Sequence, residues 1–364
     1  MVDARRYEWL DRRRTERSSF VPDNLRKRNF DNAVKRYNFL VRANQATCEV
    51  LIEYAVTLEL MGDYSGAVSQ LPRIEEKLGD NSENLGNFGW LLADLGMYET
   101  GIKHLERAIT RAPGLKQWQR ALALILSEDG QIETAANYAK ELTEMNPYDG
   151  PMWAARSMVE SLAGNYATSA LEYAEQAVEQ DPFGFNENQA LAFARSGLGD
   201  HVGAIEAMER IPEGERDDDI YHRCLGHFQA LVGDSGSAVE SLREAIKITD
   251  PAIRPKIFAL HGVALLAQGS QDEARKSFES GFTARSAKRE YKADDELAFA
   301  LCELGSGRTK SGISNIQENS NKYRQMRGLL SETSALLKLM QNCGVAGSDQ
   351  CITSIAKTLD TGSQ

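Results

Sequence analysis

The sequence predicts an all-α protein built from repeated helix–turn–helix units. A glycine recurs at intervals of 34 to 36 residues, and a small residue stands seven positions before each of these glycines. A second small residue stands five positions after all but the last glycine. This spacing predicts two short helices per unit, packed closely at the small residues and joined by a turn at the glycine. The turn glycines are Gly62, Gly96, Gly130, Gly164, Gly199, Gly233, Gly269 and Gly305.

The small residues occupy one fixed position in each predicted helix. In the first helices they are Ala55, Gly89, Ala123, Ser157, Ala192, Gly226, Gly262 and Ala298. In the second helices they are Ala67, Gly101, Ala135, Ser169, Ala204, Ala238 and Ala274, whereas the eighth copy has Lys310. Prolines near the ends of repeats are expected to stop one helix before the next begins; they are Pro113, Pro147, Pro182 and Pro251.

This pattern resembles the tetratricopeptide repeat family, whose 34-residue unit is a helix–turn–helix. The segment GNYATSALEYAEQAVEQDP, residues 164–182, is most similar to the family consensus and has one extra residue after the turn. The resemblance implies a right-handed superhelical solenoid in which the first helix of each repeat lines the concave side.

The chain is expected to consist of a solenoid with caps at both ends. Eight repeats are placed over residues 48–324, preceded by a half-repeat or capping helix over 29–47. Residues 325–341 are expected to form a C-terminal capping helix, because terminal repeats need a cap. Residues 342–364 are predicted to be a polar tail that frays, and residues 1–28 form a basic N-terminal arm.

The groove residues follow from the resemblance, which places the ninth residue of each first helix on the concave side. These residues form a nearly continuous apolar stripe, which predicts binding of a peptide or an amphipathic helix of a protein partner. The alternative is that the protein's own terminal helices cover the stripe, or that it is buried between repeats. The candidate partner-binding residues are Val56, Trp90, Leu124, Met158, Phe193, Arg223, His227, Val263 and Phe299.

Groove charge is expected to change sign along the chain. The early lining positions are acidic, and the later ones are basic, which would direct the basic end of a bound segment toward the early repeats. The alternative is that these charges only keep the solenoid soluble. The acidic positions are Glu49, Glu59, Glu83, Asp94 and Glu128, and the basic ones are Arg223, Lys256 and Lys292.

The formal charge of -11 is divided unevenly between the start of the chain and the rest. Residues 1–46 carry 12 Lys or Arg against 6 Asp or Glu, a balance of +6, so the other 318 residues have a balance of -17. Four arginines dominate the arm: Arg12, Arg13, Arg14 and Arg17. We expect the arm to dock on an acidic protein surface, its own or a partner's; nucleic acid or anionic lipid is the alternative.

Motifs for catalysis are absent from the sequence. It contains no G-x-S-x-G, H-E-x-x-H, Walker A or G-x-G-x-x-G pattern. His222 and His227, beside Cys224, are five residues apart and do not share a helix face, so neither a metal nor a cofactor is expected.

Cysteine content and hydropathy indicate a compartment for the chain. Five cysteines without C-x-x-C spacing, and no apolar run long enough to span a bilayer, favour a cytoplasmic protein.

The sequence therefore predicts a non-enzymatic scaffold or adaptor that binds a protein segment in its groove. The alternative is a regulatory or targeting subunit of an enzyme or of a nucleic-acid-linked complex, acting through the basic arm. The oligomeric state is left open by the sequence.

Overall fold

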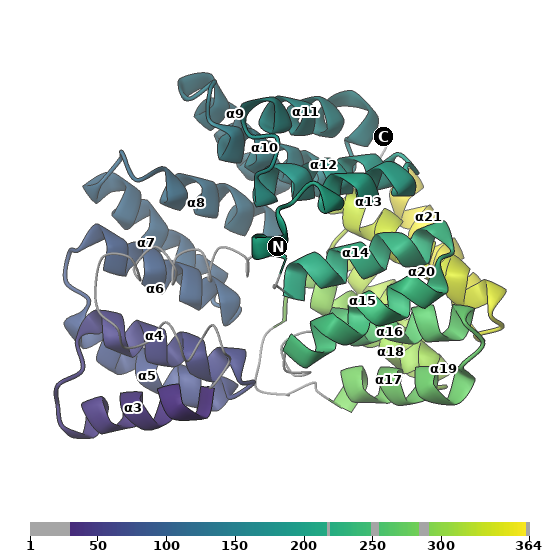
Figure 1. The fold of residues 1–364 in the computed structure, drawn as a ribbon, viewed down its shortest axis with the longest axis horizontal. Helices are drawn as coiled ribbons and strands as arrows, with labels where there is room; N and C mark the ends of the chain where they lie inside the picture. The colour runs from purple at the N-terminus through teal and green to yellow at the C-terminus, as the bar shows by residue number, and fades with distance from the viewer. Residues whose placement is uncertain (1–29, 217–218, 249–254, 284–290, 362–364) are drawn as a thin grey trace. The chain divides into compact units, whose positions relative to one another are not determined.

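The structure is a computed structural model that describes residues 30–216, 219–248, 255–283 and 291–361. Throughout these ranges the regular structure is helical, which confirms the predicted all-α solenoid of repeats (Figure 1). The chain divides into two compact units. Unit 1 holds the described residues up to Ala121, and unit 2 holds nearly all of those from Leu122 onward.

The helices follow one another in antiparallel pairs with short connections. Unit 1 contains α3 (Phe30–Arg42), α4 (Cys48–Leu60), α5 (Tyr64–Lys77), α6 (Ser82–Asp94) and α7 (Tyr98–Arg111), and α8 (Lys116–Glu128) crosses the boundary. Unit 2 contains α9 (Ile132–Met145), α10 (Gly150–Ala163), α11 (Leu171–Gln180), α12 (Phe185–Gly197), α13 (His201–Glu209), α14 (Asp219–Val232), α15 (Ser235–Ile248), α16 (Pro255–Ala267), α17 (Gln271–Thr283), α18 (Ala293–Gly305), α19 (Thr309–Lys322), α20 (Arg327–Asn342) and α21 (Ser348–Thr361).

The turn within each pair is made by a glycine in the left-handed conformation, which side chains disfavour. Seven of the predicted turn glycines have φ between 79° and 94°. The prediction was wrong for the eighth turn, because Gly305 is the last residue of α18 and the left-handed residue is Gly307, with φ 87°.

Moving the eighth turn to Gly307 changes the register of that repeat by two residues. The small residues then become Ala300 and Gly312, both buried, so the exception at Lys310 disappears. The same shift moves the equivalent groove position from Phe299 to Leu301. Because two glycines lie two residues apart at this turn, spacing alone could not decide between them.

One repeat accommodates its extra residue in a π-helical turn. Residues Tyr166–Ala170 form a π-helix at the start of the second helix, directly before α11. A single inserted residue in a helix is commonly absorbed in this way. The fully buried small residue of this second helix is therefore Ala170, whose carbonyl oxygen accepts a hydrogen bond from Ser157 Oγ at 2.7 Å. The sequence-based choice of Ser169 was one residue too early.

The small residues let the two helices of a repeat approach at backbone distance. A Cβ atom built on Gly89 would lie 2.7 Å from the carbonyl oxygen of Gly101, and one built on Gly101 would lie 2.6 Å from that of Gly89. These distances are shorter than a carbon–oxygen contact allows. The α6–α7 pair therefore requires glycine at both positions.

Beyond the eighth repeat, the chain forms two further helices. The capping helix predicted over residues 325–341 corresponds to α20. Residues 342–364 were expected to be a frayed polar tail, but α21 covers Ser348–Thr361 and buries Cys351 and Ile355. The few apolar residues of α21 are spaced helically and pack against α19 and α20. The prediction of a frayed tail relied on the overall polarity of the segment and did not take this spacing into account.

We predict that Gly101→Ala destabilises the chain by about 1–3 kcal/mol, because the added methyl group overpacks the α6–α7 contact. Alanine has an intrinsic helix propensity about 1 kcal/mol more favourable than that of glycine. Propensity alone would therefore stabilise the variant, whereas overpacking destabilises it, and the sign of the measured change shows which effect is larger. Gly114→Ala is the control, since its Cβ would meet nothing within 4 Å. Urea denaturation measures both variants, and a stabilised Gly101→Ala chain would contradict the prediction.

Candidate functional site

The first helices of unit 2 form a surface that holds another helix of the same chain. Helix α20, the first of the two helices that follow the eighth repeat, contacts α10, α12, α14, α16 and α18, which are the first helices of five successive repeats. We call this side of the five helices the first-helix surface. It corresponds to the side that the family resemblance assigns to the groove. In unit 2, α20 therefore covers the surface on which the groove was predicted.

The beginning of α20 fits tightly against α10. A Cβ atom on Gly328 would lie 1.8 Å from the carbonyl oxygen of Ser161 and 2.6 Å from Tyr166 Oη. On the other side of this contact, a Cβ on Gly164 would lie 3.0 Å from Arg327 Cβ. The two helices therefore meet with no room for a side chain at position 328.

Apolar side chains on both sides of the contact form one hydrophobic cluster. Buried residues of α20 and the predicted groove residue Val263 belong to this cluster, together with residues of α16 and α18. Each fully buried large side chain contributes about 1.5–3 kcal/mol to stability. The cluster members on α20 are Leu329, Leu330, Leu336, Leu337 and Met340.

A polar cluster lies within this apolar contact and is centred on Glu332 of α20. Glu332 Oε1 is 2.8 Å from Lys256 Nζ of α16 and 3.5 Å from His227 Nδ1 of α14. The side chains of Lys256 and Glu332 are only 13% and 19% exposed. Arg223 of α14 is also buried and acts electrostatically on the same carboxylate. For an ion pair with so little solvent contact, the cost of desolvation offsets much of the Coulomb attraction.

The pKa values in the cluster follow from burial and from the opposite charges. Burial alone would raise the pKa of Glu332, but Lys256 and then His227 outweigh burial and lower it. Burial would lower the pKa of Lys256, but Glu332 and Asp294 outweigh it and raise the value. For His227, burial dominates and lowers the pKa to about 4, with Glu332 opposing the shift. At neutral pH the cluster therefore holds an ionised Glu–Lys pair beside a neutral histidine.

The predicted groove residues differ in how far they are buried. The stripe in unit 2 is mostly closed to solvent, and only Phe193 is half-buried, with its ring centroid 5.5 Å from that of Phe228. In unit 1, Trp90 is half-buried and Val56 is buried. The arginines of the basic arm, Arg12, Arg13, Arg14 and Arg17, lie outside the described residues. The buried groove residues of unit 2 are Leu124, Met158, Arg223, His227, Val263 and Phe299.

The first helices of unit 1 carry an acidic face. α4 and α6 contact each other, and helical spacing places Glu49, Glu53 and Glu59 on the side of α4 that carries Val56. On α6, the same spacing places Glu83 and Asp94 beside Trp90. Asn84 Nδ2 of α6 donates a hydrogen bond to Glu49 Oε1 of α4 at 3.3 Å, which ties the two helices together. The acidic face thus consists of Glu49, Glu53, Val56, Glu59, Glu83, Trp90 and Asp94.

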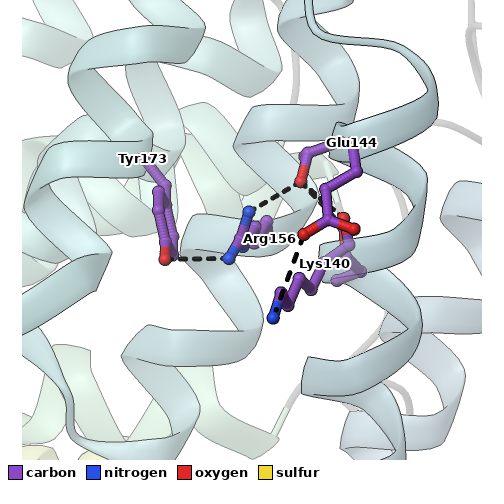
Figure 2. A network of polar contacts seen from close by, with 6 residues as sticks. Lys140, Glu144, Arg156 and Tyr173 are labelled. Carbon is purple, nitrogen blue, oxygen red and sulfur yellow. Dashed lines mark hydrogen bonds and ion pairs between the residues drawn. The ribbon is translucent and has the colours of Figure 1, made fainter.

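A second polar network, centred on Arg156 of α10, links three consecutive helical segments of unit 2 (Figure 2). The guanidinium donates to Thr143 Oγ1 at 2.7 Å and to Tyr173 Oη at 2.9 Å. Its Cζ lies 3.9 Å from the centre of the Tyr173 ring, with the Trp153 ring on α10 also nearby at 5.6 Å. Because Nη1 and Nη2 donate to two different neighbouring helices, the network ties α9 and α11 to α10. Sequence analysis did not identify this network.

The residues around Cys224, at which no metal was expected, make packing contacts. Cys224 Sγ is buried and accepts a hydrogen bond from Gln189 Nε2 at 3.7 Å, while His227 faces Glu332. In the described ranges, no three His, Cys, Asp or Glu side chains come together as a metal site. All five cysteines are free thiols. None of the described helices combines the length and apolar character needed to cross a membrane.

Comparison with known proteins identifies the repeat. Models of the tetratricopeptide repeat match residues 120–185 and residues 82–114. No curated protein matches the chain significantly. Among solved structures, it is similar to a tetratricopeptide repeat protein from Parabacteroides merdae, with 17% identity and a TM-score of 0.46, covering 70% of this chain and 98% of that one. It is also similar to the human IFIT1 dimer with PPP-AAAA, with 14% identity and a TM-score of 0.48, covering 92% of this chain and 86% of that one.

The chain contains tetratricopeptide repeats, which the family models match over residues 82–114 and 120–185. Repeats of this class support a protein-interaction scaffold in general terms.

We predict that Glu332→Gln lowers the free energy of unfolding by about 2–4 kcal/mol, because it leaves Lys256 charged in a poorly solvated site. The double variant Lys256→Met/Glu332→Leu should recover at least half of this loss, since two apolar side chains replace the pair. Chemical denaturation of the wild type, Glu332→Gln and the double variant measures the two losses. If Glu332→Gln and the double variant lose the same free energy of unfolding, Glu332 and Lys256 do not form the buried ion pair described here.

We predict that stability falls as the pH decreases from 6.5 to 5, in part through His227. Its native pKa of about 4 lies below the ordinary value of 6.5, so the unfolded chain binds the proton first and is favoured as the pH falls. The contribution over this range is up to about 2 kcal/mol. Accordingly, His227→Gln should lose less stability between pH 6.5 and pH 5 than the wild type. His222→Gln on the same helix is the control, and equal pH dependence in the two variants would count against the prediction.

Proposed function

We propose that this protein is a non-enzymatic scaffold that binds a basic amphipathic helix of a partner protein on the acidic face of unit 1. The observation that carries the proposal is α20, which lies across five first helices of unit 2. This contact supports the proposal that the first helices of this chain can bind another helix. A partner helix on α4 and α6 would use the same kind of contact.

The residues of the acidic face favour a basic partner. Trp90, Glu49 and Glu53 are half-buried and Glu83 is exposed, so the accessible part of the face is one aromatic ring beside three carboxylates, while Val56, Glu59 and Asp94 are buried. Such a surface is complementary to a helix with an apolar stripe flanked by Lys and Arg. Aromatic residues at the centre of an interface commonly supply much of its binding energy, so Trp90 is the principal anchor in this proposal.

The non-enzymatic assignment is supported by the repeat architecture and by the positions of the titratable groups. The His227 cluster lies beneath α20, where its side chains hold two packed elements together. His261 Nδ1 pairs with Ser277 Oγ at 3.0 Å, and Ser277 Oγ in turn donates to the carbonyl oxygen of Phe258 at 3.0 Å. These groups therefore have structural contacts that account for them.

We predict that Trp90→Ser weakens partner binding at least tenfold, because it removes an anchor worth about 1.5–3 kcal/mol. A photocrosslinking residue placed at Glu83, which is exposed, captures the partner from cell extract, and mass spectrometry identifies the crosslinked segment. The expected segment is a basic amphipathic helix, and its synthetic peptide then gives Kd by titration.

Tyr148→Ser is the matched control, since Tyr148 is an 87% exposed aromatic residue in a loop of unit 2. Equal peptide affinity in the Trp90→Ser and Tyr148→Ser variants, with both folded by circular dichroism, would contradict the proposed site.

A further inference from the structure

We propose that the loops that follow α9 and α11 form a second docking surface, which binds an extended segment rich in arginine or lysine from a partner protein. The surface consists of Met145, Tyr148 and Phe183 with the carboxylates around them, and we call it the aromatic loop surface. It belongs entirely to unit 2 and lies in the loops between repeats. The proposal does not depend on the function proposed for the acidic face.

The apolar side chains of the aromatic loop surface are unusually exposed. Tyr148 is 87% exposed, Met145 64% and Phe183 63%. Tyr148 and Phe183 each follow the proline of a loop between two repeats, so they occupy equivalent positions in consecutive repeats. Single exposed apolar residues are normal on a protein surface, whereas a group of them marks an interaction site.

The fold does not require an aromatic residue at this loop position. In three consecutive loops, the carbonyl oxygen of the proline accepts a hydrogen bond from a side chain six residues later. The donors are Gln119 Nε2 to Pro113 at 3.4 Å, Trp153 Nε1 to Pro147 at 2.8 Å and Asn188 Nδ2 to Pro182 at 2.9 Å. The residue after the first of these prolines is Gly114, and a Cβ built there meets nothing within 4 Å. Because the same loop forms without an aromatic ring, packing does not account for Tyr148 and Phe183.

The two loops lie side by side because the helices that follow them pack together (Figure 1). α10 begins at Gly150 and α12 at Phe185, and these helices contact each other. A Cβ atom on Gly150 would lie 3.2 Å from Gln180 Cβ, so the start of α10 also touches the end of α11. Packed helices lie about 8–10 Å apart, and three residues of an extended chain span about 10 Å. Basic residues three positions apart in an extended segment can therefore reach both loops.

The charge of this region selects a basic partner. Residues 140–194 contain nine Asp or Glu and two Lys or Arg, a balance of -7. Of the two basic residues, Arg156 donates to Thr143 and Tyr173, and Lys140 pairs with Glu144 at 3.9 Å (Figure 2). Such a region attracts cationic segments and repels the phosphates of nucleic acids and anionic lipids.

The helix ends at the aromatic loop surface add to this preference. A helix carries a partial negative charge at its C-terminus, which a basic residue in the last turn stabilises. α5, α7 and α15 have Lys77, Arg111 and Lys247 in their last turns, whereas α9 and α11 have no basic residue there. The start of α10 is capped by Asp149, which accepts a hydrogen bond from the backbone N–H of Met152. A cation of the partner would therefore take the place that the chain's own basic residue has in other repeats.

Contacts within unit 2 show the chemistry that would hold this cation. Arg156 Cζ lies 3.9 Å from the centre of the Tyr173 ring, and Arg308 Cζ lies 4.1 Å from the centre of the Phe282 ring. A cation over an aromatic ring and beside a carboxylate gains from both contacts. Each loop offers this combination, because the exposed carboxylates of Glu144 and Glu179 stand four residues before Tyr148 and Phe183.

Fluorescence anisotropy of a synthetic peptide tests the aromatic loop surface in the full chain. The probe is acetyl-GRGGRGGRGGRG-amide with a neutral coumarin label, in which every third residue is arginine. A reference probe has citrulline in place of each arginine. The test variant is Tyr148→Ser/Phe183→Ser. The control variant is Phe39→Ser/Val202→Ser, which removes two exposed apolar side chains outside these loops.

We expect the test variant to bind the arginine probe about five- to thirtyfold more weakly than the wild type and the control do, because two cation–π contacts are lost. Glu144→Gln/Glu179→Gln keeps the size of both side chains and should weaken binding about threefold, and about 0.5 M salt should weaken wild-type binding as well. The citrulline probe should bind the wild type at least tenfold more weakly than the arginine probe does. The substitutions are at exposed positions, so circular dichroism should show an unchanged helix content.

Equal affinity of the arginine probe for the wild type and the test variant would overturn the proposal, and so would equal affinity of the wild type for the two probes. A dimer of the wild type that dissociates in the test variant, without binding of the arginine probe, would show that a second copy of the chain covers this surface instead.

Failure of the function proposed for the acidic face gives a different result. In that case Trp90→Ser leaves the affinity of the helical peptide unchanged, while binding of the arginine probe still depends on Tyr148 and Phe183. The helical peptide and the arginine probe are titrated separately, so Tyr148→Ser remains the control for Trp90→Ser.

Discussion

The close approach of two helix backbones within each repeat is the constraint on which the rest of the structure depends. At Gly89 and Gly101, a single methyl group on either helix would collide with the carbonyl oxygen of the other. The same position is filled by Ala170 in the repeat that carries a π-helix, where Ser157 adds a hydrogen bond across the contact. Because the small residues fix how each hairpin closes, they also fix which side of its first helix faces the next repeat.

The first helices of unit 2, once aligned by this constraint, share one surface, and the chain itself covers it with α20. In unit 2, α20 lies on that surface through a leucine-rich face and a single carboxylate, Glu332. The carboxylate meets Lys256 and His227 from two different repeats. These contacts tie α20 to two neighbouring repeats of unit 2. In unit 1, the corresponding helices carry carboxylates themselves, which suits a basic ligand.

Much of the fold could be predicted from the sequence, because the repeat imposes local rules. Glycine at a left-handed turn and small residues at a helix contact are needed for steric reasons, and seven of the eight turns were identified from spacing alone. The eighth was misplaced because Gly305 and Gly307 satisfy the same rule. α21 was missed because Cys351 and Ile355 are two apolar residues in a polar segment, and their burial depends on α19 and α20.

The site was harder to predict, because its parts come together only in three dimensions. Glu332 was not singled out, since its partners His227 and Lys256 lie far away in the sequence and in separate repeats. The apolar stripe along unit 2 could be predicted from helical spacing, but the packing of α20 against these first helices depends on how the last hairpin turns.

The most direct measurement of the central claim is hydrogen exchange on the full chain, with and without a saturating synthetic peptide of the partner helix. We predict that peptide binding slows amide exchange in α4 and α6 and leaves the exchange of α5, α7 and α20 unchanged. Slower exchange in the second helices alone would contradict this prediction. So would faster exchange in α20 together with slower exchange in its first-helix neighbours α10, α12, α14, α16 and α18, because the peptide would then have displaced α20.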